Sequence, residues 1–306
     1  MELIRGQHNL RPEHRGCVAT IGNFDGVHRG HQAILAQLTA IGQAEDLPTT
    51  LMTFEPLPRE FFAPGQAPAR LSRLTEKLAL LQRYGLDRVL CVRFDRAFAA
   101  LSPEQFIRRM LVEGLGVRHL IVGDDFRFGC RASGDYSLLV KAGREHGFKV
   151  SRQTTFCLDD ERISSTRVRS ALAEGDLVEA TRLLGRPYSM SGRVVGGDRI
   201  GRTLDYPTAN IPIDRCRSPL TGVFAVRVYG LDDQPLPGMA NIGTRPTIDG
   251  DQPRFEVHLF DFDRDIYGRR VEVEFIHFLR AERRFDSLDG LRQQLHEDAR
   301  QARALL

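Results

Sequence analysis

The sequence predicts an α/β domain followed by a small antiparallel β-barrel with a C-terminal helix. In the first half, short apolar runs alternate with longer amphipathic stretches, which is typical of a parallel sheet with flanking helices. After about residue 186 the helical periodicity is lost, and Gly and Pro turns separate short strand-like runs. The chain has 306 residues, which is enough for two domains. We therefore expect domains at 1–185 and 186–306.

The elements of the first domain follow from the apolar pattern. Strands are expected at 17–21, 49–54, 88–94 and 119–122, with one more apolar run at 149–158. Helices are expected at 32–44, 74–84 and 103–115. In the first of these helices, Ile34, Leu35, Leu38 and Ile41 form one apolar stripe.

The second domain shows strand-like runs and one closing helix. Strands are expected at 189–195, 223–229, 254–260 and 270–278. In the closing helix, Leu288, Leu291 and Leu295 are expected on the inner stripe. Gly185 and Pro187 interrupt a helix, so the joint between the domains is expected near 184–189.

Composition narrows the choice of partners and compartment. The 43 basic and 40 acidic residues form no clustered basic block, which argues against nucleic acid or a membrane surface as a partner. No run approaches the roughly 18 apolar residues of a membrane span, and the first 20 residues lack a signal core. The five cysteines are scattered and form no CxxC, as expected for reduced thiols. We expect a cytoplasmic protein, a monomer or weak homo-oligomer, that binds small molecules.

Residues 22–31 read GNFDGVHRGH and join a predicted strand to a predicted helix. Gly22 and Gly26 permit tight turns, and the helix start near Gly30 offers N–H groups and a positive dipole end to a phosphate. His28 and His31 stand three apart at this helix start and can donate hydrogen bonds to phosphate oxygens, most strongly in a transition state.

Two alternatives exist for this histidine pair. An HxxH pair can bind a metal, but no third ligand of suitable type is near in the sequence. The pair can also be two ordinary surface histidines. The surrounding glycines and the strand–turn–helix context disfavour both alternatives.

The same residues carry a resemblance to known families. His28-Arg29-Gly30-His31 resembles the signature of the nucleotidyltransferase superfamily, and the longer string from Gly22 to His28 resembles the bacterial bifunctional riboflavin kinase/FAD synthetase family. The resemblance implies a Rossmann-like nucleotidyltransferase fold for the first domain. It implies catalytic roles for His28 and His31 and ATP contacts for Gly22, Phe24, Asp25 and Gly30.

A second phosphate-binding element is expected at 162–169, which reads RISSTRVR and opens a helix. Hydroxyls and arginines at a helix N-terminus suit an anion clamp, although they also suit an N-cap with solvated arginines. The resembled family carries a matching Ser-Ser-Thr-x-x-Arg element. The resemblance therefore assigns ATP phosphates to Arg162, Ser164, Ser165, Thr166 and Arg169.

Two further segments follow predicted strands and are expected at the edge where open sheets bind ligands. Residues 122–129 read VGDDFRFG, and residues 54–62 read FEPLPREFF, whose prolines and rings suit a flat isoalloxazine. Ordinary core packing is the alternative for the phenylalanines. By resemblance, Asp125 and Arg127 bind ATP. The expected flavin contacts are Phe54, Pro56, Phe62, Phe126 and Phe128.

Residues 196–203 (GGDRIGRT) nearly match a P-loop, but we reject that interpretation. Arg stands where the P-loop has Lys, and Tyr206-Pro207 follows too soon for the required helix. The residues resemble instead the family's Gly-Arg…Pro-Thr-Ala-Asn motif, in which a Gly-rich turn holds phosphate and hard oxygens suit Mg²⁺. The resemblance assigns nucleotide to Gly201 and Arg202, and Mg²⁺ to Thr208 and Asn210. One departure is Asp205, where relatives commonly have Gly, and it leaves the local loop geometry open.

The catalytic base of the second domain is expected in the strand 255–259, which alternates apolar and polar residues. Glu256 suits a base for an attacking hydroxyl, but the pattern alone equally allows a solvent-facing Glu, or Glu272 or Glu274 as the base. The resemblance singles out Glu256. It also places Asn241, Gly243 and Thr244 near the kinase nucleotide, and residues 280–285 over the flavin.

The resemblance covers about residues 3–305, with five motifs in the family's order. It implies that the second domain phosphorylates riboflavin with Mg·ATP to give FMN. It implies that the first domain then joins FMN to AMP from a second ATP, giving FAD and pyrophosphate without a covalent enzyme intermediate. The alternatives are an adenylyltransferase for another phosphate-bearing substrate, disfavoured by the kinase-like half, and a flavin or nucleotide sensor, disfavoured by the full set of catalytic residues.

Overall fold

The computed structural model describes residues 1–153, 156–196, 206–213, 215, 217–247 and 250–306, and only the backbone of 244–247 and 250–253. The chain forms two compact units, which we call the first unit (Met1–Pro68 and Lys77–Ser164) and the second unit (Ala69–Glu76 and Ser165–Leu306). The expected division at 185/186 follows the change in sequence pattern, whereas the compact units divide at Ser164/Ser165 and assign a short early segment to the second unit.

The first unit contains a parallel sheet, as predicted. Its described strands are β1 (Glu2–Arg5), β2 (Val18–Ile21), β3 (Thr49–Glu55), β4 (Arg88–Arg93), β5 (His119–Gly123) and β6 (Lys149–Gln153). They lie in the order β1-β4-β3-β2-β5-β6, and every neighbouring pair is parallel. The strands leave β2 in opposite directions, towards β3 and β4 on one side and β5 and β6 on the other. Ligands of open parallel sheets bind at the carboxyl ends of strands at such a point, here β2 and β5.

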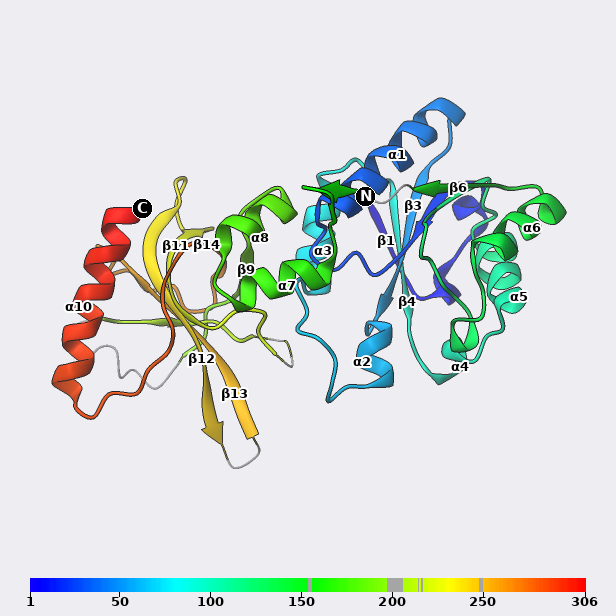
Figure 1. Ribbon diagram of the computed structural model, residues 1–306. Coiled ribbons are helices and arrows are strands. Elements are labelled where there is room, and N and C mark those ends of the chain that lie inside the picture. The colour runs from blue at the N-terminus through cyan, green and yellow to red at the C-terminus, as the bar shows by residue number, and fades with distance from the viewer. Residues whose placement is uncertain (154–155, 197–205, 214, 216, 248–249) are drawn as a thin grey trace. The chain divides into compact units, whose positions relative to one another are not determined.

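Helices cover both faces of this sheet (Figure 1). The described helices are α1 (Arg29–Glu45), α2 (Pro58–Phe62), α3 (Leu74–Gln82), α4 (Arg96–Ala99), α5 (Pro103–Phe106) continuing into the wider-turned η3 (Ile107–Gly114), and α6 (Tyr136–His146). Short helical turns lie at η1 (Gln7–Asn9), η2 (Pro12–His14) and η4 (Cys130–Ala132). Successive residues of β3 serve opposite cores, because Leu51 packs with α1 and α3 whereas Met52 packs with η3 and α6. The predicted two-faced α/β architecture is therefore confirmed.

The sheet differs from the expected strands at its edges. The edge strand β1 was not predicted, because its apolar residues are only Leu3 and Ile4 between charged neighbours. The apolar run at 149–158 is not one strand, since β6 ends at Gln153 and β7 (Cys157–Leu158) pairs with β8 (Glu161–Arg162) in a separate hairpin.

The second unit contains an antiparallel sheet that closes on itself. Its described strands are β9 (Ser189–Arg193), β10 (Ala209–Asn210), β11 (Gly222–Tyr229), β12 (Leu236–Thr247), β13 (Gly250–Leu259) and β14 (Arg270–Arg280). They lie in the order β10-β13-β12-β11-β14-β9. Just beyond β9, the Val195 N–H donates to the Asn210 carbonyl at 2.9 Å, which joins the two edges of the sheet. This closure removes an exposed edge and confirms the predicted barrel.

Strand β12 was not predicted. Its twelve residues include Pro237, Gly238, Gly243 and Pro246, residue types that argue against a strand in a single sequence. Gly238 is required by close packing, because a Cβ there would lie 2.4 Å from the His258 carbonyl oxygen.

Helices α7 (Ser165–Ala173), α8 (Leu177–Leu184) and α10 (Leu288–Leu305) complete the second unit (Figure 1). Helix α8 ends at Leu184 and is capped by left-handed Gly185, and β9 begins at Ser189.

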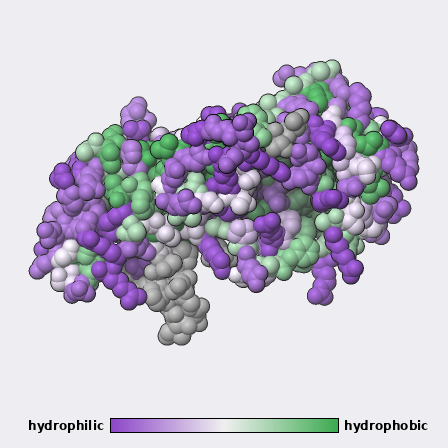
Figure 2. Space-filling view, in the orientation of Figure 1, coloured by the Kyte–Doolittle hydropathy of each residue, from purple (hydrophilic) through white to green (hydrophobic). Residues whose placement is uncertain are grey.

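Helix α10 packs on β11, β12 and β14. The prediction for its inner stripe was wrong at Leu288, which is 65% exposed, and the buried residues of the helix are Asp298, Ala299 and Ala302. Figure 2 shows mostly hydrophilic residues on the visible side of this helix. Among the described residues, no helix is long and apolar enough to cross a membrane.

Candidate active sites

The turn after β2 is held in an unusual backbone conformation. Phe24 and Val27 have φ angles of 46° and 43°, in the left-handed region that costs L-residues free energy, and Gly26 has a φ of 81°. Phe24 and Val27 are buried, so packing maintains these conformations. A Cβ on Gly22 would lie 3.0 Å from the Phe24 ring, so glycine lets the ring approach the backbone.

The two histidines have different environments at the start of α1. His28 is the N-cap of the helix, and its Nδ1 accepts a hydrogen bond from the His31 N–H at 3.3 Å. Because Nδ1 is an acceptor, the ring proton of neutral His28 is on Nε2, and a ring N–H is a donor of the kind a phosphate needs. His28 and His31 stack with ring centroids 3.6 Å apart, and Phe24 stacks on the other side of His31 at 4.5 Å.

His31 is held in its neutral form. Burial lowers its pKa well below the usual 6.5, and electrostatic interaction with His28 and Lys77 lowers it further. Its Nδ1 is buried without a hydrogen-bond partner among the described residues. A buried ring nitrogen of this kind costs about 1–3 kcal/mol until a ligand satisfies it.

One cationic residue at this site, a buried lysine, was not predicted from the sequence. Lys77, in the first turn of α3, is only 1% exposed, and its Nζ donates to the Asn23 carbonyl at 2.5 Å and to Thr53 Oγ1 at 3.4 Å. The sequence contained no signal for it, because one lysine in an amphipathic helix resembles a solvated polar residue.

Other predicted ATP residues of the first unit gather near the start of α1. Arg162 forms an ion pair with Asp125 at 2.7 Å, which ties the hairpin before α7 to the loop after β5. A Cβ on Gly30 would lie 3.6 Å from the carbonyl oxygen of Ile163, the residue before Ser164. Asp25 is buried beside the histidines in the same turn, whereas exposed Arg127 approaches Asp135 at 3.8 Å.

The rest of the predicted phosphate element opens α7 in the second unit. Ser165 is the first residue of the helix, Thr166 is exposed, and Arg169 Nε donates to the Ala69 carbonyl at 2.6 Å. Arg167, which the sequence suggested as a third clamp arginine, forms an ion pair with Glu179 at 2.6 Å.

The predicted flavin rings belong to one aromatic cluster in the first unit. Phe94 contacts both Phe54 and Phe62, at centroid distances of 5.8 and 5.6 Å, and Phe126 stacks on Phe128 at 5.6 Å. Phe54 and Phe128 are buried in the core, whereas Phe62 is 67% exposed. Phe126 is half-buried and Pro56 is exposed, so these two and Phe62 present surface to a ligand.

Two cavities meet in the second unit. One has a volume of about 560 Å³ and is lined on one side by the loop 262–267, with Asp263 and Asp265. The other, of about 350 Å³, is lined by Glu256 and by apolar side chains that include Phe285 and Leu295. Thr208 and Asn210 line both cavities, so they stand on the wall that the two share.

Three predicted residues form one row across neighbouring strands. In the sheet register Glu256 pairs with Asn210 of β10 on one side and with Asn241 of β12 on the other. Directly paired side chains point to the same face and lie within about 4.5–5.5 Å at Cβ. Phe255 and Val257 point into the core, as the predicted alternation requires, so the row faces away from it.

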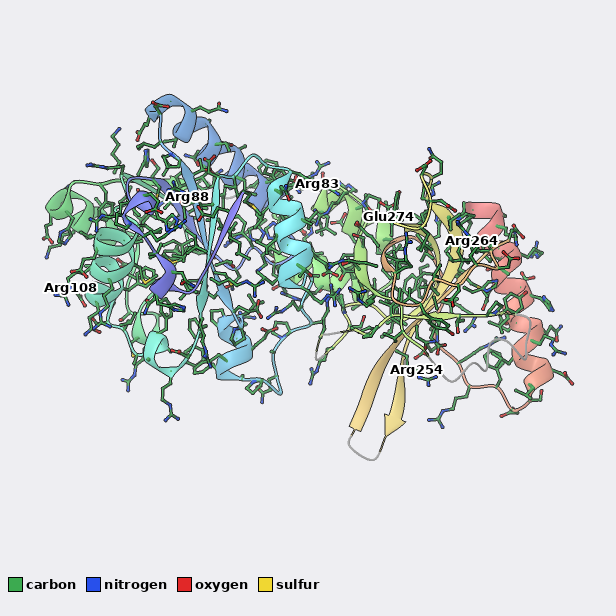
Figure 3. The ribbon with its side chains drawn as sticks, turned by 180° about the vertical axis from the view of Figure 1, so that it is seen from behind. Arg83, Arg88, Arg108, Arg254, Arg264 and Glu274 are labelled. Atoms are coloured by element: carbon green, nitrogen blue, oxygen red, sulfur yellow. The ribbon has the colours of Figure 1, made fainter. Side chains whose placement is uncertain are left out.

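The structure separates Glu256 from the other carboxylates that the sequence allowed. Glu272 accepts a hydrogen bond from Ser189 Oγ at 2.7 Å, and Glu274 accepts one from the Tyr229 hydroxyl at 3.1 Å. Figure 3 shows Glu274 well apart from Arg254, whose Nη1 lies 3.4 Å from Glu256 Oε1. Both alternatives lie on β14, which is three strands from β13.

His258 contacts the residues just before Thr208, on the wall that the two cavities share. Its Nδ1 donates to the Pro207 carbonyl at 2.9 Å, directly before Thr208, and its ring packs edge-on against Tyr206 at 4.9 Å. Burial lowers the pKa of His258, so the ring is neutral and keeps this donor at neutral pH.

Comparison with known proteins identifies the family of this chain. The family model described as FAD synthetase matches residues 10–167, and the model described as riboflavin kinase matches residues 184–306. The curated bifunctional riboflavin kinase/FMN adenylyltransferase of Escherichia coli (strain K12) is 55% identical over 99% of this chain and 97% of its own length. The protein of the same name from Pseudomonas fluorescens is 53% identical over 100% and 98%.

The chain belongs to the bifunctional riboflavin kinase/FMN adenylyltransferase family. The resemblance inferred from the motifs is therefore confirmed. A crystal structure from Streptococcus pneumoniae, described as a macrolide-efflux protein, matches with a TM-score of 0.82 at 30% identity over 99% of both chains. That structure has the same fold as this family member.

Some predicted kinase residues of this family member lie outside the described residues. These are Gly201 and Arg202, together with the departure at Asp205, and for Thr244 the structure describes only the backbone in β12. A Cβ on Gly243 would lie 1.7 Å from Glu282 Oε1, so the Glu282 carboxylate approaches the backbone closely at this position. Asn241 Nδ2 approaches the same Glu282 oxygen at 3.4 Å, within the smaller cavity.

Sequence reasoning identified the closing segment 280–285 but not what holds it. Arg280 donates three hydrogen bonds of 2.7–3.0 Å to Asp298 of α10, whose side chain is 1% exposed. Arg283 lies over the Phe285 ring at 4.8 Å, and both line the smaller cavity. His258 was also missed, because only the tertiary structure brings it to the cavity wall.

Among the described residues, no three His, Cys, Asp or Glu side chains are placed to hold a metal ion. The donor set at the shared wall is of a different kind, because a Thr hydroxyl and an Asn carbonyl oxygen face the cavity that also holds Asp263 and Asp265. Such hard oxygens, with room for water, fit Mg²⁺ better than a transition metal.

Proposed function

We propose that this chain phosphorylates riboflavin to FMN with ATP and then adenylylates FMN to FAD with a second ATP. Family membership over both halves of the chain supports this function. The observation that carries it is the pair of separate sites: stacked histidines at the switch point of the parallel sheet, and the Asn210–Glu256–Asn241 row beside two joined cavities in the barrel. The alternative function, adenylylation of another phosphate-bearing substrate, would not require the second of these sites.

In the adenylylation, an FMN phosphate oxygen attacks the α-phosphorus of ATP, the bond to the bridging oxygen breaks, and pyrophosphate leaves. The N-terminus of α1 receives the nucleotide phosphates, and His28 donates from Nε2 as charge grows on them. His31 stays neutral, so it donates through a ring N–H and does not repel the Lys77 charge. Positioning and charge stabilisation suffice, and no covalent enzyme intermediate is needed.

The nucleotide contacts of the first site remain those proposed from the sequence. The turn after β2 supplies Gly22, Phe24 and Asp25, and the start of α1 supplies Gly30. The loop after β5 and the start of α7 supply Asp125, Arg127, Arg162, Ser164, Ser165, Thr166 and Arg169. Within the first unit, the Arg162–Asp125 ion pair supports the proposed contacts of these two residues, because a triphosphate can replace Asp125 as the anion next to Arg162.

For the flavin in the first unit, we propose contact with Phe62, Phe126 and Pro56. These residues present surface, whereas Phe54 and Phe128 support them from the core. An aromatic ring system stacked on such side chains gains about 0.5–1.5 kcal/mol beyond burial of its area.

In the phosphorylation, the larger cavity of the second unit takes ATP and the smaller one takes riboflavin. The γ-phosphate then meets the ribityl chain at the wall formed by Thr208 and Asn210. Glu256 accepts the proton of the ribityl hydroxyl as its oxygen attacks the γ-phosphorus and ADP leaves. Mg²⁺ held by Thr208 and Asn210 would neutralise charge on the phosphates. Gly201, Arg202, Asn241, Gly243 and Thr244 remain the other proposed nucleotide contacts. Asn241 lines the smaller cavity and pairs with Glu256, so its contact would be with the γ-phosphate where that phosphate meets the ribityl chain.

The proposed catalytic domains are 1–185 and 186–306, and the matched family regions support this division. We propose that the protein works in the cytoplasm, as a monomer or weak homo-oligomer, on small molecules and without nucleic acid. Cys17, Cys130 and Cys157 are free thiols, which suits a reducing compartment. Size-exclusion chromatography with light scattering, with and without flavin and ATP, tests the oligomeric state.

The function is tested by incubating the protein with riboflavin, ATP and Mg²⁺ and separating the flavins by chromatography. We expect FMN first and FAD afterwards. Adenylylation of another phosphorylated acceptor, with no FMN or FAD, would favour the rival adenylyltransferase. Flavin binding without turnover would favour a sensor.

Variants separate the two sites. His31→Ala should stop FAD formation and leave FMN formation intact, and Glu256→Gln should stop FMN formation and still convert supplied FMN to FAD. Glu272→Gln, at a residue of β14 that lines neither cavity, is the matched control for Glu256→Gln. Loss of both steps from either single change, in a folded protein, would contradict the two-site arrangement.

A further inference from the structure

Lys77 is an unusual residue for its position. Its side chain is buried at 1% exposure, and a lysine is almost never buried to that extent without a specific partner. It also stands in the first turn of α3, where the helix dipole disfavours a cation. The contacts that hold Lys77 in this place therefore bear on what the residue does.

The ammonium of Lys77 acts on one carbonyl of the histidine site. Its Nζ donates to the Asn23 oxygen at 2.5 Å and to Thr53 Oγ1 at 3.4 Å, and Thr53 Oγ1 lies 3.4 Å from the same Asn23 oxygen. Lys77 of α3 and Thr53 of β3 thus meet at the peptide group that joins Asn23 to Phe24. A charged donor makes the stronger of these hydrogen bonds.

That peptide group controls the position of the catalytic ring. Phe24 is left-handed, with a φ of 46°, a conformation that persists only where the surroundings impose it. The Phe24 ring stacks on His31 at 4.5 Å, and His31 stacks on His28 at 3.6 Å. A continuous set of contacts therefore runs from Lys77 through Asn23 and Phe24 to the histidine pair.

We propose that Lys77 is a positioning residue for FMN adenylylation, which holds the Asn23–Phe24 turn so that the His31 ring stays in place at the start of α1. The inference rests on the proposed function of that site. Because Lys77 is buried at 1% exposure, we assign its effect to the turn and to the field at His31 and not to contact with substrate.

The test uses the full chain and measures FAD formation from FMN and ATP. Lys77→Met keeps the length of the side chain and removes the charge, and we expect kcat to fall about 10–100-fold, the loss that a displacement of about 1 Å produces. The KM values for FMN and ATP should change little, because the substrate contacts remain. Arg83→Met is the matched control, since it removes an exposed cation just after the same helix (Figure 3).

A double-mutant cycle with His31→Ala separates positioning from a general structural effect. If Lys77 acts through His31, Lys77→Met should lower kcat little further in the His31→Ala background, measured with labelled ATP. Independent effects would multiply, and such a result would overturn the inference. A kcat for Lys77→Met within about twofold of the parent would also overturn it.

Thr53→Val covers the case in which Lys77→Met does not fold, because valine has nearly the shape of threonine and removes only the hydroxyl. We expect a smaller fall in the kcat of FAD formation, with riboflavin phosphorylation unchanged as the internal control. An unchanged kcat in a chain where Lys77→Met is unfolded would overturn the inference. Absence of FAD from the parent enzyme would overturn the proposed function, and with it this inference, whereas parental FAD formation by Lys77→Met would overturn the inference alone.

Discussion

His28 and His31 stand three positions apart, yet the structure gives the two rings different chemistry. His28 is the N-cap, so a backbone N–H sets its tautomer. His31 lies between two rings, its buried Nδ1 has no hydrogen-bond partner in the described part of the chain, and its pKa is lowered well below 6.5 by burial. The sequence predicted the residues, but the difference between them depends on burial, which spacing does not specify.

The first prediction concerns the pH dependence of stability. The unfolded chain binds a proton at His31 with a pKa near 6.5, and the folded chain does so only at a much lower pH. Below about pH 6.5 the unfolded state therefore binds more protons than the folded state, which favours unfolding. Above about pH 6.5 His31 is neutral in both states, so this destabilisation is absent and its contribution to the free energy of unfolding is complete. It is lost as the pH falls towards the folded pKa, at up to about 1.4 kcal/mol per pH unit.

Urea unfolding of parent and His31→Gln between about pH 5 and 7.5 checks this prediction. As the pH falls, the free energy of unfolding should decrease more for the parent than for His31→Gln. His8→Gln, at an exposed position, is the control and should leave the pH dependence of the parent unchanged. Parallel curves for parent and His31→Gln would contradict the prediction.

The alternation of apolar and polar residues along a strand could not identify Glu256 as the candidate base. Alternation in β13 and β14 made Glu256, Glu272 and Glu274 equivalent, because a period of two specifies only a face of a strand. The register places Glu256 between Asn210 and Asn241, while Glu272 and Glu274 bond to Ser189 and Tyr229. Strand order therefore decides which carboxylate lies at the cavity.

At the scale of elements, α10 is held against the barrel by an ion pair as well as by apolar contacts. Arg280 of β14 donates to both oxygens of Asp298, which is buried, and Gln294 donates to the same carboxylate at 2.6 Å. Glu297, one position before Asp298, has its pKa lowered to about 2 by hydrogen bonds from Arg300, but the pair is exposed to solvent. Solvent screens such a pair, so its pKa shift says little about stability.

The second prediction compares these two ion pairs. Arg280→Met should lower the free energy of unfolding of the second unit by about 3–5 kcal/mol, because the Asp298 carboxylate then stays buried without its cation. It should also impair riboflavin phosphorylation, since Arg280 lines the smaller cavity. Urea unfolding followed by far-UV circular dichroism measures the first effect, and product chromatography the second.

Glu297→Gln is the matched control on the same helix. It should leave unfolding and phosphorylation close to the parent values, because its pair is exposed. If both changes lowered the free energy of unfolding equally, the burial of Asp298 would not explain the loss of stability in Arg280→Met.

Elements with a clear period were predicted well, and elements without one were not. Helix α1 and strand β3 carry enough apolar residues to be recognised locally. Strand β12 contains Gly and Pro, and β1 has one buried residue, Ile4, so their pairing comes from neighbouring strands rather than from their own residues.

At the scale of the whole molecule, a segment from the first half of the sequence belongs to the second unit. Residues 69–76 are joined to it by a buried cluster in which Glu76 forms an ion pair with Arg215, and Arg215 donates to the Tyr188 hydroxyl at 2.8 Å. Tyr188 in turn donates to the Leu71 carbonyl at 2.8 Å, and Glu76 accepts from the Ser191 N–H at 2.9 Å. Sequence pattern cannot assign such a segment, because the contacts span more than a hundred residues.

The third prediction tests this cluster. Glu76→Gln keeps the shape of the side chain and removes the charge beside Arg215, whose side chain is 1% exposed. We expect the second unit to lose about 3–5 kcal/mol of stability, since a buried guanidinium is left without its carboxylate. The measurement is the temperature at which riboflavin phosphorylation is lost on heating, which reports on the second unit although the substitution is in the first half of the chain.

Asp232→Asn is the control for Glu76→Gln. It removes a carboxylate from an exposed pair with Arg264 in the same unit (Figure 3), and we expect no measurable shift of the inactivation temperature. An inactivation temperature unchanged by Glu76→Gln would mean that residues 69–76 do not stabilise the barrel.

The sequence by itself determined the fold class, the strand–turn–helix character of the histidine segment and the motif residues of both sites. These properties depend on periodicity and spacing over short stretches, which the chain specifies locally. Only the tertiary structure decided that Lys77 is buried against the Asn23 carbonyl, that Glu256 is the carboxylate beside Asn210, and that residues 69–76 join the barrel. Burial, register and long-range pairing arise from packing between distant segments, and no local pattern encodes them.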